Sequence, residues 1–131
     1  MIEALVDNEL VFDLGNTVFP EIGPIIRQSD VVITDYSSLF LDAVYASKPV
    51  ICFAYDLDHY RDNQDGLLYD LDIVFPGPIV NSFQLLMDAV EHELTYHQQV
   101  SSIKYQYIKR LFFEYKDDKN AERIVSLIKK V

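Results

Sequence analysis

The chain has 131 residues, half of them hydrophobic, so we expect one packed domain, or part of a larger one, rather than a disordered chain. Its formal net charge of −10 argues against a nucleic-acid partner, because a general nucleic-acid binder needs a basic face that neutralises phosphates. No apolar run approaches the ~20 residues of a membrane-spanning helix, and no signal peptide is recognisable. We therefore expect a cytoplasmic protein in which the single cysteine, Cys52, is a buried apolar residue.

The first half of the chain alternates between predicted strands and helices. Residues 10–13 are predicted to form a short strand, and residues 21–28 a short helix. Residues 31–34 and 50–54 are continuously apolar, which is typical of parallel strands covered on both faces. Apolar residues at helical spacing predict a helix at 37–47 between them. Strand, helix and strand with short connections indicate a right-handed βαβ unit and hence an α/β fold.

The second half of the chain is predicted to be a loop followed by helices. Residues 55–72 are acidic and aromatic, and they are predicted to form a long loop with a short strand near Leu68. Pro76-Gly77-Pro78 is predicted to be a turn. Three helices are then predicted, at residues 82–98, 100–114 and 119–130.

The turn after the second predicted strand is the best candidate for a binding site. Ligands of parallel α/β sheets bind at the carboxyl ends of strands, where residues 34–38 are expected to lie. The first N–H groups of the following helix attract anions such as phosphate, and Ser37 and Ser38 add hydroxyl donors. Asp42 lies one turn after Ser38 on the same side. Because a carboxylate would repel a phosphate, Asp42 is expected to accept hydrogen bonds from ligand hydroxyls.

Two other interpretations of this turn stay open. Ser37 is equally consistent with an ordinary helix cap, and Asp42 with a solvated helix residue. Alternatively, Asp35 at the end of a strand resembles the phosphate acceptor of response-regulator receivers. That fold needs an acidic pair after an earlier strand to hold magnesium, and Asp13 is only one candidate.

Three further motifs are weak indicators of chemistry. Asp56-Leu57-Asp58 matches the DxD pattern of metal-dependent glycosyltransferases, but Asp70-Leu71-Asp72 repeats it by chance, so a solvated acidic loop is the better interpretation. His92 and His97 are five residues apart, which places them about 140° apart on a helix and prevents them from sharing one metal ion. His59 is a lone loop histidine. We therefore expect no metal and no cofactor.

A series of motifs in fixed order resembles the CDP-glycerol glycerophosphotransferase family of teichoic acid synthesis. The family shows a block like SDVVITDYSS at residues 29–38, an aspartate like Asp42, a KPVI segment like residues 48–51, a YDxxxYRD stretch like residues 55–62 and a PGP like residues 76–78. The closing segment, FFEYKDDKNAERIVSLI, also resembles the end of the family pattern, although an aspartate stands at position 118 where glycine is usual.

The resemblance implies a GT-B architecture, in which two Rossmann-like halves enclose the active site and the carboxyl-terminal half binds the nucleotide donor. The chain would then be a single, partial donor-binding domain over residues 1–131, with its carboxyl-terminal helices at about 82–130. Carried over position by position, Ser37, Ser38 and Asp42 match CDP-glycerol-binding residues of the family. The complete enzyme would transfer glycerol phosphate from CDP-glycerol to an acceptor hydroxyl in teichoic acid or a related polymer.

The resemblance also implies what the chain lacks. The family's catalytic histidine, in a His-Gly motif, and a donor-binding His-Pro motif belong to upstream sequence, so no catalytic residue is expected here. The missing amino-terminal half would bind the acceptor and associate with the inner face of the cell membrane. Two alternatives remain: another GT-B transferase of sugar or ribitol phosphate, and a non-catalytic domain that binds nucleotide or a partner subunit.

Overall fold

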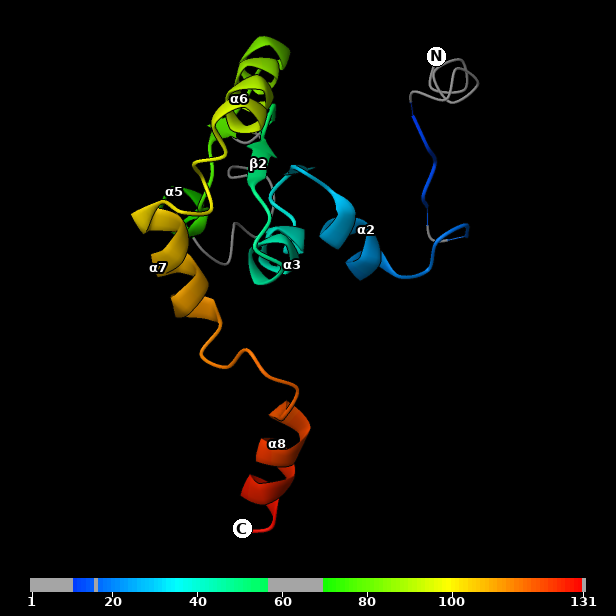
Figure 1. The fold of residues 1–131 in the computed structure, drawn as a ribbon, viewed down its shortest axis with the longest axis vertical. Helices are drawn as coiled ribbons and strands as arrows, with labels where there is room; N and C mark the ends of the chain where they lie inside the picture. Colours follow the sequence, from blue (N-terminus) through cyan, green and yellow to red (C-terminus); the bar gives the residue numbers. More distant parts are fainter. Residues whose placement is uncertain (1–10, 16, 57–69, 131) are drawn as a thin grey trace.

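The computed structural model describes residues 11–15, 17–56 and 70–130. At its centre is a parallel sheet of three short strands in the order β1-β2-β3 (Figure 1). The strands span Val32–Thr34, Val50–Phe53 and Ile79–Val80. The predicted α/β class with a parallel sheet is confirmed, and the helix between β1 and β2 forms the predicted βαβ unit.

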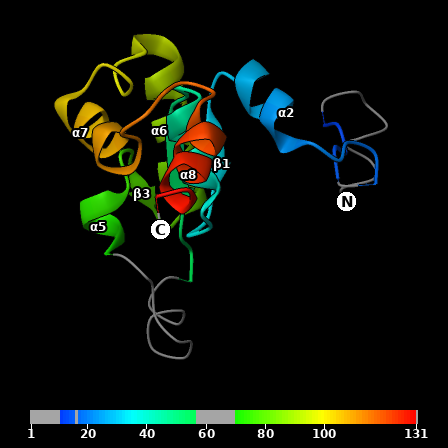
Figure 2. The ribbon, with the colours of Figure 1, turned by 90° about the horizontal axis from the view of Figure 1, so that it is seen from below.

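Helices pack around this sheet, except for the last one in the chain, which lies apart from it (Figure 1). In the described residues they are α2 (Ile22–Gln28), α3 (Leu39–Tyr45), α5 (Leu71–Val74), α6 (Phe83–Tyr96), α7 (Ile103–Phe112) and α8 (Asn120–Ile128). Both views place α2 on the β1 side of the sheet and α5 with α7 on the opposite side (Figures 1 and 2). The helix predictions at 21–28, 37–47, 82–98, 100–114 and 119–130 are therefore confirmed, with ends shorter by a few residues.

The alternation of side chains along β2 divides the core into two layers. Val50 and Cys52 face one side and pack with Val44 of α3 and Tyr105 of α7 in the larger cluster. Ile51 faces the other side and packs with residues of β3 and α6. All of the three consecutive β2 residues from Val50 are fully buried, as expected for a central parallel strand covered on both faces.

The structure differs from the sequence predictions at three places. Residues 11–13 form no strand. Ile79–Val80, to which no element was assigned, is a short strand that pairs with Cys52 and Phe53 of β2. On α6, Leu94 was expected to lie in the apolar stripe but is exposed, whereas the neighbouring Glu93 is buried and accepts the Gln99 N–H group at 3.2–3.3 Å. The strand predicted near Leu68 lies outside the described residues.

Helix α7 is fixed to the end of α3 by two polar side chains. The buried Tyr105 hydroxyl donates to the Lys48 carbonyl oxygen at 2.7 Å. The Lys109 ammonium donates to the Tyr45 carbonyl oxygen at 3.2 Å and to the Ser47 hydroxyl. Burial lowers the pKa of Lys109, yet its charge complements the negative end of the α3 dipole. These contacts hold the chain between α3 and β2 in place.

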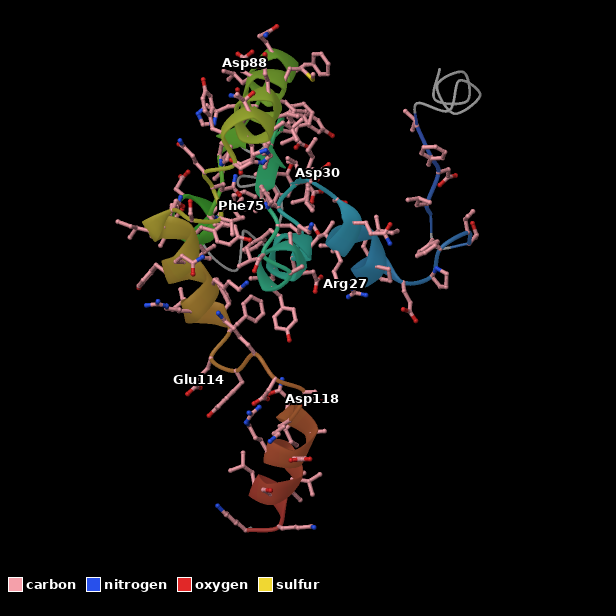
Figure 3. All side chains as sticks on the ribbon, viewed as in Figure 1. Arg27, Asp30, Phe75, Asp88, Glu114 and Asp118 are labelled. Atoms are coloured by element: carbon pink, nitrogen blue, oxygen red, sulfur yellow. The ribbon has the colours of Figure 1, made fainter. Side chains whose placement is uncertain are left out.

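Helix α8 extends away from the sheet, beyond the linker that carries Glu114 and Asp118 (Figures 1 and 3). The Arg123 side chain ties this helix to the linker, with its guanidinium 2.5 Å from an Asp117 carboxylate oxygen and 3.7 Å from the Tyr115 ring centroid. The spacing of Ile124, Leu127 and Ile128 predicts a packing face on this helix, but all three are exposed. No α8 residue is buried among the described residues.

Gly77 allows the Pro76-Gly77-Pro78 segment to pass directly against the first residue of β2. A Cβ atom at Gly77 would lie 1.8 Å from the Val50 carbonyl oxygen and 2.8 Å from the Gln99 amide nitrogen. The same Gln99 side chain accepts the Val50 N–H group at 2.6 Å. Glycine is therefore required here for space, so that β3 can pair with β2.

We expect Gly77→Ala to lower the free energy of unfolding by about 3 kcal/mol, because the added methyl group must displace backbone. Urea unfolding followed by circular dichroism measures the change. Gly23→Ala is the matched control, since its added Cβ meets only the flexible end of Arg27 at 3.3 Å, and it should change stability by less than about 1 kcal/mol. Equal losses in the two variants would contradict the close approach at Gly77.

Cys52 should be inert in the folded protein, as predicted for a buried apolar residue. Burial, assisted by the charge of Asp35, raises the pKa of the Cys52 thiol from 9.0 to about 11. The thiol is therefore neutral at pH 8, and the thiolate is the reactive form. A disulfide reagent at pH 8 should label Cys52 only after denaturant is added, and rapid labelling of the native chain would contradict this placement.

Candidate functional site

The turn between β1 and α3 is held by hydrogen bonds from its own side chains. The Asp35 carboxylate accepts the Ser37 N–H group at 2.8 Å, and the Ser37 hydroxyl oxygen accepts the Leu39 N–H group at 3.2 Å. Ser37 thus acts as the expected helix-capping side chain, and Asp35 shapes the turn. Two of the N–H groups that were expected to attract an anion are already satisfied within the turn.

Ser38 is the open position of this turn. It lies in helical conformation immediately before α3, is exposed, and makes no side-chain capping bond. Neither its N–H group nor its hydroxyl has a hydrogen-bond partner among the described residues. The hydroxyl and N–H of Ser38 are therefore the donors that this turn can offer to a ligand at the carboxyl end of β1.

Asp42 lies on the side of α3 that faces α2. Its exposed carboxylate lines a cavity of about 300 Å³ together with residues of α2, including Arg27. Figure 3 marks Arg27 on α2 beside α3. The residues that line this cavity do not include Ser37 or Ser38, so the structure places the two serines at the head of α3 and Asp42 in the adjoining groove.

A contact between a tyrosine and an aspartate joins this turn to the end of β2. The Tyr36 hydroxyl donates to a carboxylate oxygen of Asp56, and this hydrogen bond raises the pKa of Tyr36. The contact brings residues twenty apart in sequence together at the carboxyl ends of neighbouring strands. Asp56 is therefore a second carboxylate, after Asp35, that contacts a side chain or backbone group of this turn.

Sequence reasoning missed two features of the site. Nothing in the spacing of Tyr36 and Asp56 indicates that they meet, because the contact follows from the pairing of β1 with β2. Arg27 was missed because its helix was assigned no role. The only sequence signal for it is indirect: a single arginine stands just before the SDVVITDYSS block in a strongly acidic chain.

The remaining sequence candidates take structural roles or lie outside the described residues. Asp70 caps α5 by accepting the Asp72 N–H group at 3.0 Å, and Asp13 accepts the Gly15 N–H group at 2.8 Å. His92 and His97 are both exposed, as expected. Leu57, Asp58 and His59 lie outside the described residues. In the described part of the chain no three His, Cys, Asp or Glu side chains are grouped to hold a metal ion.

A larger cavity, of about 370 Å³, lies on the other side of the sheet's core. Gly77, Glu93 and Gln99 line it, the same residues that fix the start of β2. The Glu93 and Gln99 side chains in this cavity are therefore engaged in holding the fold together. Within the described residues, no helix combines the length and the apolar character needed to cross a bilayer.

Comparisons with known proteins agree on one family. A family model described as CDP-glycerol:poly(glycerophosphate) glycerophosphotransferase matches residues 7–130. A teichoic acid poly(ribitol-phosphate) polymerase of Bacillus spizizenii is 33% identical over 110 residues, which are 84% of this chain and 17% of that protein. The teichoic acid ribitol-phosphate polymerase TarL of Staphylococcus aureus is 34% identical over 108 residues, 82% of this chain and 18% of that protein.

A solved structure shows the same relationship. A variant of the wall teichoic acid polymerase TagF, studied after a 30-minute soak with CDPG, superposes on 96% of this chain with a TM-score of 0.64 and 26% identity. This chain corresponds to 31% of that chain. It therefore spans less than a third of the solved polymerase and less than a fifth of the two ribitol-phosphate polymerases.

Asp35 should be tested as the residue that shapes the turn. Asp35→Ala removes the acceptor of the Ser37 N–H group and should lower the free energy of unfolding by about 1 kcal/mol, whereas Asp35→Asn keeps an acceptor and should cost less. Asp30→Ala is the matched control, because exposed Asp30 has no hydrogen-bond or ion-pair partner among the described residues. Urea unfolding measures all three, and equal effects of the alanine and asparagine variants would argue against the turn contact.

Proposed function

We propose that this chain, which belongs to the CDP-glycerol:poly(glycerophosphate) glycerophosphotransferase family, is the donor-binding part of a transferase. The transferase would move glycerol phosphate from CDP-glycerol to an acceptor hydroxyl. The observation that carries the proposal is the position of Ser38 and Asp42. Ser38 lies immediately before the helix that follows the parallel strand β1, at the edge where α/β sheets bind ligands, and Asp42 lies on that helix one turn later. The polymer formed would be teichoic acid or a related cell-wall or capsule polymer.

The residues divide the donor between them in this proposal. Ser37 and Ser38 lie at the start of α3, where the hydroxyl and N–H of Ser38 would donate to the pyrophosphate. Asp42, one turn further along, would accept hydrogen bonds from hydroxyls of the donor, on its ribose or its glycerol. Asp35 would act indirectly, by holding the Ser37 backbone in the turn.

The fold supports this assignment at the level of architecture. We propose that the three parallel strands and their helices are part of the Rossmann-like, donor-binding half of a GT-B enzyme. The superposition with TagF over 96% of this chain supports the proposal. The catalytic base and the acceptor site would be supplied by other parts of a longer polypeptide. Each of the two ribitol-phosphate polymerases is more than five times as long as the segment that matches this chain.

The cellular place of the enzyme follows from its proposed substrates. Nucleotide-activated donors are made in the cytoplasm, so the donor-binding half would work there. The growing polymer is attached at the membrane, so the full-length enzyme would associate peripherally with the inner face through its remaining part.

A second candidate differs only in the alcohol that is transferred. Two of the similar proteins are ribitol-phosphate polymerases, with 33% and 34% identity over more than four-fifths of this chain. CDP-ribitol is therefore the alternative donor, on the same turn and with the same role for Asp42. If no CDP-alcohol is bound, the alternative is a non-catalytic domain that binds nucleotide or a partner subunit.

Calorimetric titration of the 131-residue chain with CDP-glycerol, CDP-ribitol, UDP-glucose and CMP tests the proposal. We expect a CDP-alcohol to bind, UDP-glucose to give no heat, and none to be turned over. Ser38→Ala and Asp42→Ala should each weaken CDP-alcohol binding by about tenfold. Ser38→Ala removes a hydrogen bond to the charged pyrophosphate, and Asp42→Ala removes the carboxylate that accepts hydrogen bonds from the donor hydroxyls.

Two substitutions far from the turn provide the controls. Ser126→Ala on α8 and Asp88→Asn on α6 change the same residue types at exposed positions and should leave affinity within twofold. Figure 3 marks Asp88 at the end of the molecule opposite α8. Absence of heat with every nucleotide would contradict the proposed function.

A further inference from the structure

The groove between α2 and α3 brings a cation and a carboxylate into one cavity. Arg27 of α2 and Asp42 of α3 both line this space of about 300 Å³, whose other walls include Ile22 and Ile26. Ile26 is buried in the main core, so the packing of α2 against α3 that forms the groove is fixed by apolar contacts. One wall of the cavity is therefore formed by the packed core, whereas Arg27 and Asp42 line it as exposed side chains.

The Arg27 side chain is directed along α2 toward the start of the helix, which is the usual direction of side chains in an α-helix. Basic residues in a last helical turn commonly interact with the carbonyl oxygens at the helix end. Here the Arg27 Nη1 atom lies beside Gly23, four residues toward the start of the helix, at 3.3 Å from where a Cβ would be. The guanidinium therefore points away from the helix carbonyls, and the missing side chain at Gly23 leaves room for it.

Arg27 is also unpaired, although Asp42 lines the same cavity. The guanidinium has no hydrogen bond or ion pair with any residue that the structure describes. Two other cations show the contrast: Lys109 donates to groups at the end of α3, and Arg123 pairs with Asp117. Arg27 is therefore a cation in the groove that is available to a ligand.

The charge of the neighbourhood indicates which ligand group needs this cation. Asp35 and Asp56 contact the turn before α3 and Asp42 lines the groove itself, and a carboxylate near a bound diphosphate would repel it. A guanidinium offsets that repulsion and can bind a phosphate through two parallel hydrogen bonds. The cavity lies at the lower end of the roughly 300–1,000 Å³ of small-molecule sites, which suits an alcohol phosphate better than a whole nucleotide.

We infer that Arg27 binds the phosphate that is transferred together with the alcohol, while Asp42 in the same cavity accepts hydrogen bonds from the alcohol hydroxyls. This inference rests on the donor site proposed above and adds to it a specificity residue on α2. The cavity then distinguishes a CDP-alcohol, which carries the transferred phosphate and its alcohol, from a nucleoside monophosphate, which has only the phosphate attached to its ribose.

Calorimetric titration of the full chain and its variants with CDP-glycerol and with CMP tests the assignment. Arg27→Ala should weaken CDP-glycerol binding by about tenfold and leave CMP binding within twofold. Arg27→Lys, which keeps the charge without the planar fork, should give an intermediate loss for CDP-glycerol. Arg110→Ala, at an exposed arginine on α7, is the matched control and should change neither affinity. If CDP-ribitol is the bound donor, the same pattern is expected with it in place of CDP-glycerol.

The outcomes separate this inference from the proposed function. Unchanged CDP-alcohol binding in Arg27→Ala would overturn the role of Arg27 and leave the donor site standing. An equal loss for CMP would also overturn it, because Arg27 would then act on the nucleotide or on the fold. If the wild-type chain binds no CDP-alcohol, both proposals fail together. Because Arg27 is exposed, Arg27→Ala should unfold in urea as the wild type does, and Arg27→Gln provides a second neutral variant.

Discussion

The buried central strand β2 is the constraint on which the rest of the structure depends. Its residues are covered on both faces, so the two neighbouring strands and the helices α3, α6 and α7 are placed by how they pair with it or pack against it. Pairing with β1 sets the position of the turn before α3, and the approach of Gly77 to Val50 sets the position of β3. The candidate site thus inherits its geometry from the core, although its own residues are exposed.

The candidate site balances a stable turn against an unfavourable charge. Asp35 and Asp56 stabilise the loops by accepting hydrogen bonds from Ser37 and Tyr36, but both add negative charge where an anionic donor is proposed to bind. Water screens the exposed Asp35 carboxylate more than the half-buried Asp56, and a bound ligand would displace part of that water. A cation in the neighbouring groove, Arg27, could offset this negative charge when a diphosphate binds.

Much of the fold could be predicted because its signals are local. The apolar runs at 31–34 and 50–54 correctly predict β1 and β2. The expected cover on both faces is found for β2 but not for β1, whose Ile33 is 48% exposed. Ile79–Val80 was missed because a two-residue strand has no period of its own and exists only through pairing with β2. Glu93 was missed for a similar reason: its burial depends on the backbone of Gln99, which sequence spacing does not bring near it.

The site shows the same limit. Ser37 could be assigned from its place before a helix, and the structure confirms its cap to Leu39. Asp42 could be placed on the same helix from spacing, but the groove that it lines exists because α2 packs beside α3, which no motif in the sequence states. Whether Ser37, Ser38 and Asp42 bind the donor stays a prediction.

The position of β1 has a consequence for how copies of this chain behave together in solution. Among the described strands β1 is an edge, so its outer N–H and C=O groups have no strand partner there, and Ile33 on one of its faces is 48% exposed. Open edges with apolar side chains promote strand pairing between molecules. The net charge of −10 opposes such contacts by mutual repulsion at neutral pH. The net negative charge therefore limits association between copies of this chain, and this effect declines as the pH falls toward the isoelectric point of about 4.5.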